Sequence, residues 1–179
     1  GNLPVAKSYL AGCGTQTAAL GFGGYITPPA STVATSEEYN GSSWTAGGTM
    51  GTGRRRLGGA GTQTAGLAFG GTAATYSALT EEYDGSTWTA GGSLNTARQY
   101  GAGTGTQNAA FAISGTTGTR TANTEIYDGS SWTEVNNVNT ARQINAAAGS
   151  TTAALTFGGS EPPFSDKTEE YNGSTWSEQ

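Results

Sequence analysis

The sequence contains no histidine, and Cys13 is its only cysteine among 179 residues. The chain therefore lacks the side chains that usually hold zinc or copper, and it cannot form an internal disulfide bond. We expect no metal site and no other cofactor.

Charge and long apolar runs are also scarce. Charged residues make up 12% of the chain, and eight basic against thirteen acidic residues give a net charge of −5. An acidic chain is repelled by nucleic acid, so we expect no nucleic-acid partner. No apolar run approaches the roughly 20 residues that cross a bilayer, and the first ten residues lack the features of a signal peptide. We expect no membrane insertion.

Aromatic residues recur at fixed intervals through this glycine-rich chain. Neighbouring tryptophans are 44 residues apart, at Trp44, Trp88, Trp132 and Trp176. A tyrosine stands five residues before each of them, at Tyr39, Tyr83, Tyr127 and Tyr171, and a glutamate two residues earlier, at Glu37, Glu81, Glu125 and Glu169. Asn-Gly or Asp-Gly follows each tyrosine, and these dipeptides favour tight turns. Each unit predicts a hairpin of two short strands.

Two more strands are predicted upstream of each hairpin. One carries apolar residues spaced by two and ends at a glycine, as in Leu20-Gly-Phe22 followed by Gly-Gly. The spacing places both apolar residues on one face of a strand. The other follows a basic residue, Lys7, Arg54, Arg98 or Arg142, and is rich in glycine and alanine. Four antiparallel strands in about 44 residues predict a propeller blade.

The repeat pattern continues from the end of the chain to its beginning. If Gln179 is joined to Gly1, Leu3 and Lys7 take the places of Met50 and Arg54 after the last tryptophan. This predicts one domain over residues 1–179, with repeats at about 7–53, 54–97, 98–141 and 142–179 plus 1–6. We expect four blades to close within one chain, with a dimer that forms an eight-bladed ring as the alternative.

These motifs resemble kelch repeats, in which Gly-Gly follows an apolar strand, then a tyrosine, then a tryptophan, with an arginine at the start of the next blade. The resemblance covers the whole chain and implies an all-β propeller of four four-stranded antiparallel blades. Kelch-like propellers usually present binding surfaces, often for proteins. A similar scaffold in galactose-oxidase-like enzymes uses histidine ligands that this chain lacks, so we expect no enzyme. The composition is also similar to that of phage tail proteins, which favours an extracellular or virion-associated setting.

The repeated charged residues have two interpretations. The arginines and glutamates could form a ring that binds a ligand, or ion pairs that hold the strands in register; the recurrence of the same residue in each blade favours the second. Cys13 aligns with Ala60, Thr104 and Ala148, which favours a small buried residue over a reactive thiol.

Function is best sought where the copies differ. The variable segments join the second and third strands of each blade, and the resemblance places them on one face with the connections that precede Lys7, Arg54, Arg98 and Arg142. We expect a binding module for a protein or a glycan, with contacts from Tyr25, Tyr76, Arg120 and Phe164. The alternatives are a self-assembling virion or tail structural protein and, less favoured, a metal-independent enzyme acting on glycans.

Overall fold

The protein is all-β and contains four four-stranded antiparallel sheets in a repeating pattern. The computed structural model describes residues 1–161 and 163–179. We number the sheets 1 to 4 in chain order and call the segment that forms each one a repeat. Within every sheet the strands lie in sequence order, so each strand is paired with the next strand of its repeat.

Among the described residues, the additional two-stranded hairpin occurs in repeat 1. A separate two-stranded hairpin of β3 and β4 is formed by the segment of chain that connects the second strand of the sheet to the third. The strands of this repeat are β1 (Ala11–Thr15), β2 (Ala18–Phe22), β3 (Tyr25–Ile26), β4 (Ser31–Thr32), β5 (Thr35–Tyr39) and β6 (Trp44–Thr49).

Sheets 2, 3 and 4 share one plan. Sheet 2 contains β7 (Gly58–Thr62), β8 (Ala65–Phe69), β9 (Thr80–Tyr83) and β10 (Trp88–Gly91). Sheet 3 contains β11 (Ala102–Thr106), β12 (Ala109–Ile113), β13 (Thr124–Tyr127) and β14 (Trp132–Val135). Sheet 4 contains β15 (Ala146–Ser150), β16 (Ala153–Phe157), β17 (Thr168–Tyr171) and β18 (Trp176–Glu178).

The hairpin predicted from tyrosine, turn and tryptophan is present in all four sheets. Tyr39 is paired with Trp44 across the ladder, and the same pair recurs in the other repeats. In the first turn, Oδ1 of Asn40 accepts the backbone N–H groups of Ser42 and Ser43 at 3.0 and 2.9 Å. These bonds fix the turn because a short polar side chain satisfies backbone donors that the ladder leaves free.

The sheets pack face to face, with their first strands side by side. Contacts join β1 to β7, β7 to β11 and β11 to β15. The glycines and alanines of these strands allow the close approach: a Cβ added to Gly103 would lie 2.3 Å from the carbonyl oxygen of Gly59 in the preceding sheet. The small residues that the sequence concentrates in the first strand therefore permit backbone-to-backbone packing.

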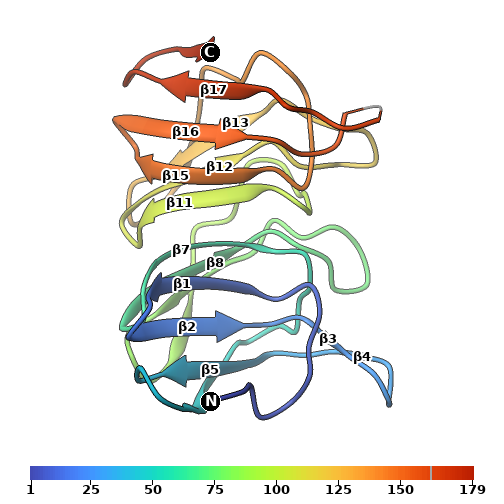
Figure 1. Ribbon diagram of the computed structural model, residues 1–179, viewed down its shortest axis with the longest axis vertical. Helices are drawn as coiled ribbons and strands as arrows, with labels where there is room; N and C mark the ends of the chain where they lie inside the picture. The colour runs from blue at the N-terminus through green and yellow to red at the C-terminus, as the bar shows by residue number, and fades with distance from the viewer. Residues whose placement is uncertain (162) are drawn as a thin grey trace.

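The row of sheets is open at its two ends. Over the described residues no comparable contact joins β15 back to β1. Figure 1 shows sheets 1 and 4 broadside at the front, below and above the centre, with sheets 2 and 3 behind them. Closure of four blades within one chain, which the sequence favoured, is not seen.

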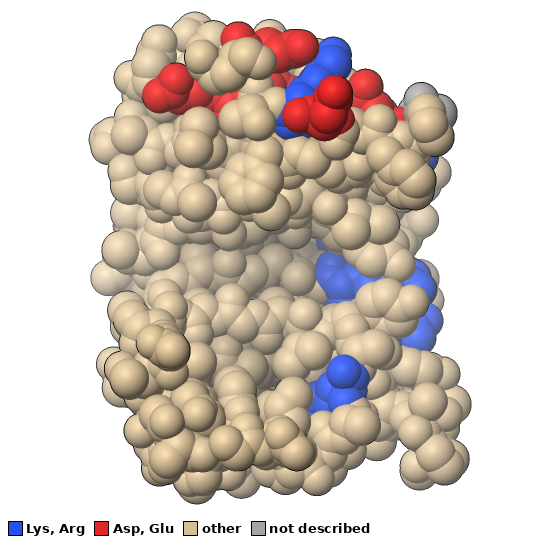
Figure 2. All heavy atoms as spheres, viewed as in Figure 1, with Lys and Arg blue, Asp and Glu red and all other residues tan. Residues whose placement is uncertain are grey.

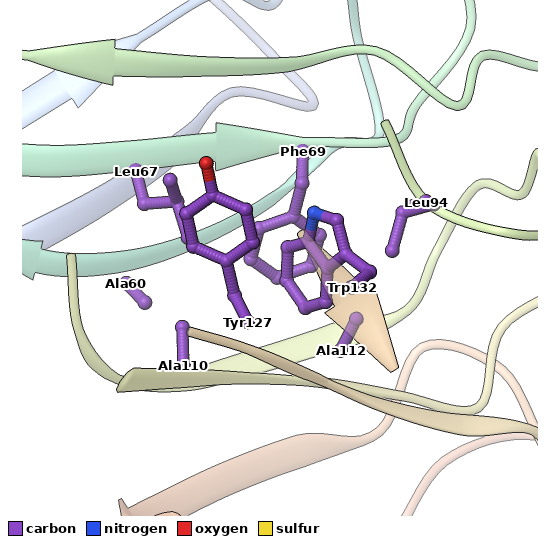
Figure 3. Packing of buried hydrophobic residues seen from close by; sticks show 8 residues of the cluster. All are labelled: Ala60, Leu67, Phe69, Leu94, Ala110, Ala112, Tyr127 and Trp132. Carbon is purple, nitrogen blue, oxygen red and sulfur yellow. The ribbon is translucent and has the colours of Figure 1, made fainter. Parts of the chain in front are cut away.

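Each core lies between two successive sheets. In the cluster between sheets 2 and 3, Leu67 and Phe69 of β8 face Tyr127 and Trp132 of sheet 3 (Figure 3). The rings of Phe69 and Trp132 meet edge to face, with centroids 4.9 Å apart. Burial of such a side chain contributes roughly 1.5–3 kcal/mol, and the edge-to-face pair about 1 kcal/mol more. Aromatic contacts thus help to hold neighbouring sheets together, alongside the close packing of the first strands.

Strands and turns account for all the regular structure in residues 1–161 and 163–179. A helix of the length and apolarity that crossing a membrane requires is not found in this part of the chain.

Candidate functional site: the mouth of the central groove

One residue in each repeat adopts a left-handed backbone conformation at the same place, two residues after the basic residue that precedes the first strand. These four, which we call the mouth row, are Tyr9, Arg56, Tyr100 and Ile144, with φ angles of 57°, 59°, 60° and 59°. Non-glycine residues rarely adopt this conformation. Its recurrence at one position shows that the packing between sheets imposes it.

Backbone hydrogen bonds link the mouth row into a chain. The N–H of Arg56 donates to the carbonyl of Tyr9 at 2.8 Å, Tyr100 to Arg56 at 2.9 Å, and Ile144 to Tyr100 at 2.9 Å. Each bond joins neighbouring repeats, so the row runs across all four sheets. The geometry of the row is therefore set by the scaffold, while the side chains differ from repeat to repeat.

The residue before each member of the row ties it to the variable loops. Ser8 is bridged to Tyr25, and the equivalent bridges join Arg55 to Thr72, Gln99 to Thr116 and Gln143 to Ser160. The first residue of each loop between the second and third strands thus lies beside the connection that enters the same repeat. The first strands of the four sheets, β1, β7, β11 and β15, line a hollow that we call the central groove. The loops and the mouth row lie at the end of this groove where the first strands begin.

Arg56 is held between two tyrosines in the mouth row. Its guanidinium carbon lies 4.9 Å from the ring centroid of Tyr9 and 4.9 Å from that of Tyr100. The two ring centroids are 6.5 Å apart. Nη1 of Arg56 also donates to Oε1 of Gln99 at 3.4 Å, and Gln99 accepts a further bond from the hydroxyl of Thr72. Cation–π contacts at exposed sites contribute about 0.5–1 kcal/mol each.

The row lines a cleft of about 480 Å³ that is open to solvent. Tyr9 and Ile144 are 49% and 58% exposed, whereas Arg56 and Tyr100 are half-buried. The remaining lining comes from Leu10, Leu57, Gly101 and Asn145. Every repeat contributes to this cleft, which therefore combines two aromatic rings, one cation and apolar surface.

Basic residues gather at this end of the groove. The second arginine of the connection, Arg55, lies over the ring of Tyr25 at 4.7 Å from its centroid. In Figure 2 the hollow that runs across the molecule has Lys and Arg atoms at one end, and the acidic atoms in view lie over the top of the molecule. Within residues 1–161 and 163–179, ion pairs involve Lys7, Arg54, Arg98, Arg142 and Lys167 but none of Arg55, Arg56 and Arg120. The charge of these three arginines is not neutralised by an ion pair in that part of the chain.

The four loop residues singled out in the sequence lie in four different loops, one in each repeat. Tyr76, Arg120 and Phe164 occupy equivalent positions in repeats 2 to 4, whereas Tyr25 is equivalent to Thr72. Arg120 donates from Nε and Nη2 to the carbonyl and hydroxyl oxygens of Ser160, at 2.7 and 3.1 Å. Phe164 is 81% exposed.

The repeated arginines and glutamates form ion pairs inside the protein. Nη2 of Arg54 donates to Glu81 at 2.9 Å, and the equivalent pairs are Lys7–Glu37, Arg98–Glu125 and Arg142–Glu169. Burial lowers the pKa of Arg98 to about 10. The second oxygen of each of three glutamates accepts a backbone N–H from the connection that arrives from the previous repeat, at Gly51, Asn95 and Asn139. The pairs therefore anchor the inter-repeat connections.

The remaining side chains that bear on function are the possible metal ligands and the single cysteine. No group of three or more carboxylates, cysteines or histidines that could hold a metal ion is present among the described residues. Cys13 is half-buried, and its thiol donates to the carbonyl of Thr62 in the next repeat at 3.3 Å. Burial raises the pKa of this thiol to about 12.

Comparison with known proteins did not assign a family. No protein-family model matches the chain, and no match was found among curated proteins.

Sequence reasoning missed the mouth row because it looked for differences only in the loops. The signal was present: two residues after the basic residue, the repeats read Tyr, Arg, Tyr and Ile. What the sequence alone could not indicate is the positive φ angle, because it arises from bonds between repeats.

Proposed function

We propose that the chain is a kelch-like β-propeller module, without catalytic activity, that binds a protein or glycan partner at the mouth of its central groove. The repeated strand pattern, the double glycines and the tyrosine and tryptophan pairs support the propeller assignment. The mouth row supports the binding role. The variable loops beside the row supply a second set of contacts.

The observation that carries the proposal is the variation of the side chains along the mouth row, which places Arg56 between Tyr9 and Tyr100. The backbone of the mouth row is the same in every repeat, yet the side chains are not. A purely structural position in a repeat protein tends to keep one residue type, as the ion-paired arginines do here. Variation at a fixed, solvent-open position is typical of a surface adapted to a ligand.

The chemistry of the cleft favours an anionic partner. A guanidinium binds a carboxylate through two parallel hydrogen bonds. Tyrosine rings offer flat apolar area at a low cost in conformational entropy. A carboxylate-bearing sugar or an acidic peptide segment meets both requirements. The glutamates of the repeats are committed to buried ion pairs, which leaves them unsuited to serve as catalytic acids in the cleft.

The test is a binding screen against neutral glycans, carboxylated glycans and acidic peptides. We expect binding to a carboxylated ligand, with at least a tenfold loss in Arg56→Gln and in Tyr9→Ala. Lys167→Ala is the matched control, because it removes a positive charge that pairs with Glu178 and does not line the cleft; it should bind like the wild type. Equal binding of the neutral counterpart, or unchanged affinity in Arg56→Gln, would contradict the proposed site.

A variant with alanine at Tyr25, Tyr76, Arg120 and Phe164 tests the loops separately. If the loops add contacts, this variant should keep the fold and bind the same ligand more weakly. Unchanged affinity would confine the site to the mouth row.

The uncovered end sheets favour a second candidate, a structural protein that assembles with copies of itself. Leu155 and Phe157 of β16 are 40% and 42% exposed, which is unusual for the apolar face of a strand in this fold.

A further inference from the structure

Each boundary between successive sheets joins two different faces. The apolar face of the second strand in one repeat receives the tyrosine and tryptophan of the next. Phe22 meets Trp88 with ring centroids 5.1 Å apart, and Phe69 meets Trp132 at 4.9 Å. The boundary between sheets 3 and 4 follows the same plan, with Phe111 5.8 Å from Trp176. Four sheets in a row contain three such boundaries and leave one face of each kind uncovered.

The uncovered face of sheet 4 is the receiving kind. Leu155 and Phe157 are 40% and 42% exposed, while their equivalents Leu67 and Phe69 are 0% and 2% exposed. Beside Leu155 lies a cleft of about 300 Å³, lined also by Ala148, Gly149, Ala153, Ala154 and Glu170. It occupies the place that, at the inner boundaries, is filled by the next repeat.

The uncovered face of sheet 1 is the inserting kind. Tyr39 is half-buried, although its equivalents Tyr83, Tyr127 and Tyr171 are buried. Trp44 is also half-buried, and its ring lies beside that of Tyr39 with centroids 5.0 Å apart. The outer face of sheet 1 thus exposes an aromatic pair of the kind that covers the second strand at each inner boundary, and Leu155 and Phe157 on the outer face of sheet 4 are the exposed residues that such a pair would cover.

Polar groups match across the two ends as well. At the first two boundaries a tyrosine hydroxyl donates to a glutamate of the preceding repeat, Tyr83 to Glu38 and Tyr127 to Glu82. Tyr39 is the equivalent of these tyrosine donors in repeat 1. Glu170, which is exposed, is the equivalent of the glutamate acceptors in repeat 4. The two uncovered faces therefore carry the two halves of this hydrogen bond.

A glutamine repeats the pattern. Nε2 of Gln63 donates to the carbonyls of Ala19 and Tyr39 in the preceding repeat, and Gln107 does the same one repeat later. Their equivalent in repeat 1 is Gln16, which is exposed. The carbonyl groups that correspond to the acceptors of Gln63 and Gln107 are those of Ala154 and Tyr171 in repeat 4.

The hydrogen-bonded chain of the mouth row also has two open ends. Within residues 1–161 and 163–179, the N–H of Tyr9 and the carbonyl of Ile144 have no backbone partner, although each inner member of the row uses both groups. In a second series, Gly24, Gly71 and Gly115 donate to the carbonyls of Arg54, Arg98 and Arg142. Gly159 and Lys7 are the unmatched donor and acceptor positions of that series.

We propose that a second copy of this chain covers both ends, so that sheet 1 of each copy packs on sheet 4 of the other and eight sheets form a closed ring. Figure 1 shows both end sheets broadside toward the same side of the molecule, and Figure 2 shows the hollow between them on that side. A second copy placed there by a two-fold axis contacts both end sheets. The same contact between sheet 1 and sheet 4 then occurs at both seams of the ring. This inference rests on the repeat architecture and is independent of any ligand.

The second copy would also complete the mouth row. Ile144 of one chain would be followed by Tyr9 of the other, so each aromatic and basic group of the cleft would occur twice around one axis. If the proposed binding function holds, the ring presents two equivalent ligand sites.

The mass of the protein in solution tests the ring. We expect light scattering coupled to size exclusion to give twice 18.0 kDa, the mass of one chain, over a wide range of micromolar concentrations. A mass of one chain throughout would overturn the proposal, and the end faces would then belong to further repeats or to another protein. A mass that grows with concentration would replace the ring with an open head-to-tail assembly.

Two pairs of variants locate the seam. Leu155→Glu should reduce the mass to that of one chain with an unchanged circular dichroism spectrum. Leu79→Glu changes a similarly exposed leucine in repeat 2, away from the end sheets, and should leave the dimer intact. Gln16→Ala should weaken the dimer at least tenfold without changing the stability of the single chain. Gln63→Ala should lower the stability of the chain and leave the mass at two copies. A Leu155→Glu protein that stays dimeric would show that the copies meet elsewhere.

Discussion

Tyr83 in the second repeat donates its hydroxyl proton to Glu38 in the first, and the same hydroxyl accepts the backbone N–H of Gly48 at 3.2 Å. Both partners lie across a boundary between sheets. Burial, followed by the bond to Glu38, raises the pKa of Tyr83 above its usual value. The tyrosine row thus provides directional bonds between repeats in addition to apolar contact.

Tyr83→Phe should lower the free energy of unfolding by about 1–2 kcal/mol, because the change removes a hydrogen bond to a charged group and keeps the ring. Tyr171→Phe is the matched control: Ile126 stands at the position of Glu38, so Tyr171 has no carboxylate there to which it can donate. Urea denaturation of both variants measures the difference. Equal losses would show that the hydroxyl of Tyr83 contributes little.

The buried ion pairs predict a large effect for a small change. Glu125 is fully buried and accepts hydrogen bonds from Arg98 and from the backbone and side chain of Asn95. Glu125→Gln should destabilise the protein by about 3 kcal/mol or more, because it leaves the Arg98 charge buried without its counter-ion. Glu178→Gln alters the exposed pair with Lys167 and should cost less than about 1 kcal/mol. Comparable effects in a denaturation experiment would contradict the anchoring role.

Replacement of Ser114 by glycine should stabilise the folded protein. It adopts a φ of 60° at the position where the other repeats have Gly23, Gly70 and Gly158, and its buried hydroxyl oxygen has no hydrogen-bond partner among the described residues. Relief of this conformation should outweigh the greater flexibility of glycine in the unfolded chain. Ser114→Gly is expected to raise the free energy of unfolding by about 0.5–1 kcal/mol in urea. A loss of stability would indicate that Ser114 makes a contact that glycine cannot replace.

Two turn aspartates should make the protein sensitive to acid. Backbone N–H groups of Ser131 and Ser130 lower the pKa of Asp128 to about 2, and those of Thr87 and Ser86 lower the pKa of Asp84. The pKa is depressed in the folded state, so this stabilisation is present above about pH 4, the unfolded value, and is lost as the pH falls toward 2.

The double variant Asp84→Asn/Asp128→Asn tests this dependence. Asn40 and Asn172 make the same bonds in the other two turns, so the fold should be kept. The melting temperature should fall less between pH 4 and pH 2 than it does for the wild type. Asp166→Asn, at an exposed aspartate outside the turns, is the control and should behave like the wild type.

Cys13 should react slowly while the protein is folded. Its pKa of about 12 compares with an ordinary value of 9.0, so at pH 8 the reactive thiolate is depleted by roughly a thousandfold. Its contribution to stability is present below about pH 9 and is lost as the pH rises toward 12. Labelling with a disulfide reagent at pH 8 should be at least a hundredfold slower in the folded protein than in urea. Equal rates would show that the thiol is accessible and ionised.

The elements of this fold were predictable because their signals are local. The pair Tyr83–Trp88 and the turn at Asp84 follow from a few adjacent residues, and all four repeats contain the hairpin where the sequence indicated it. Of the candidate site, only the end of the groove could be anticipated, through the loops that begin at Tyr25 and its equivalents. The contact of Arg56 with Tyr9 and Tyr100 joins residues of three repeats, and no local pattern encodes it.

The sequence by itself determined sixteen strands in four equal groups, because alternating apolar residues and Asn-Gly or Asp-Gly turns act over a few residues. Only the tertiary structure decided how far each sheet turns relative to the last, since that angle depends on how side chains such as Phe69 and Trp132 fill the space between sheets. Small rotations add along the row. Their sum leaves sheets 1 and 4 apart, and with them the groove and its two uncovered faces.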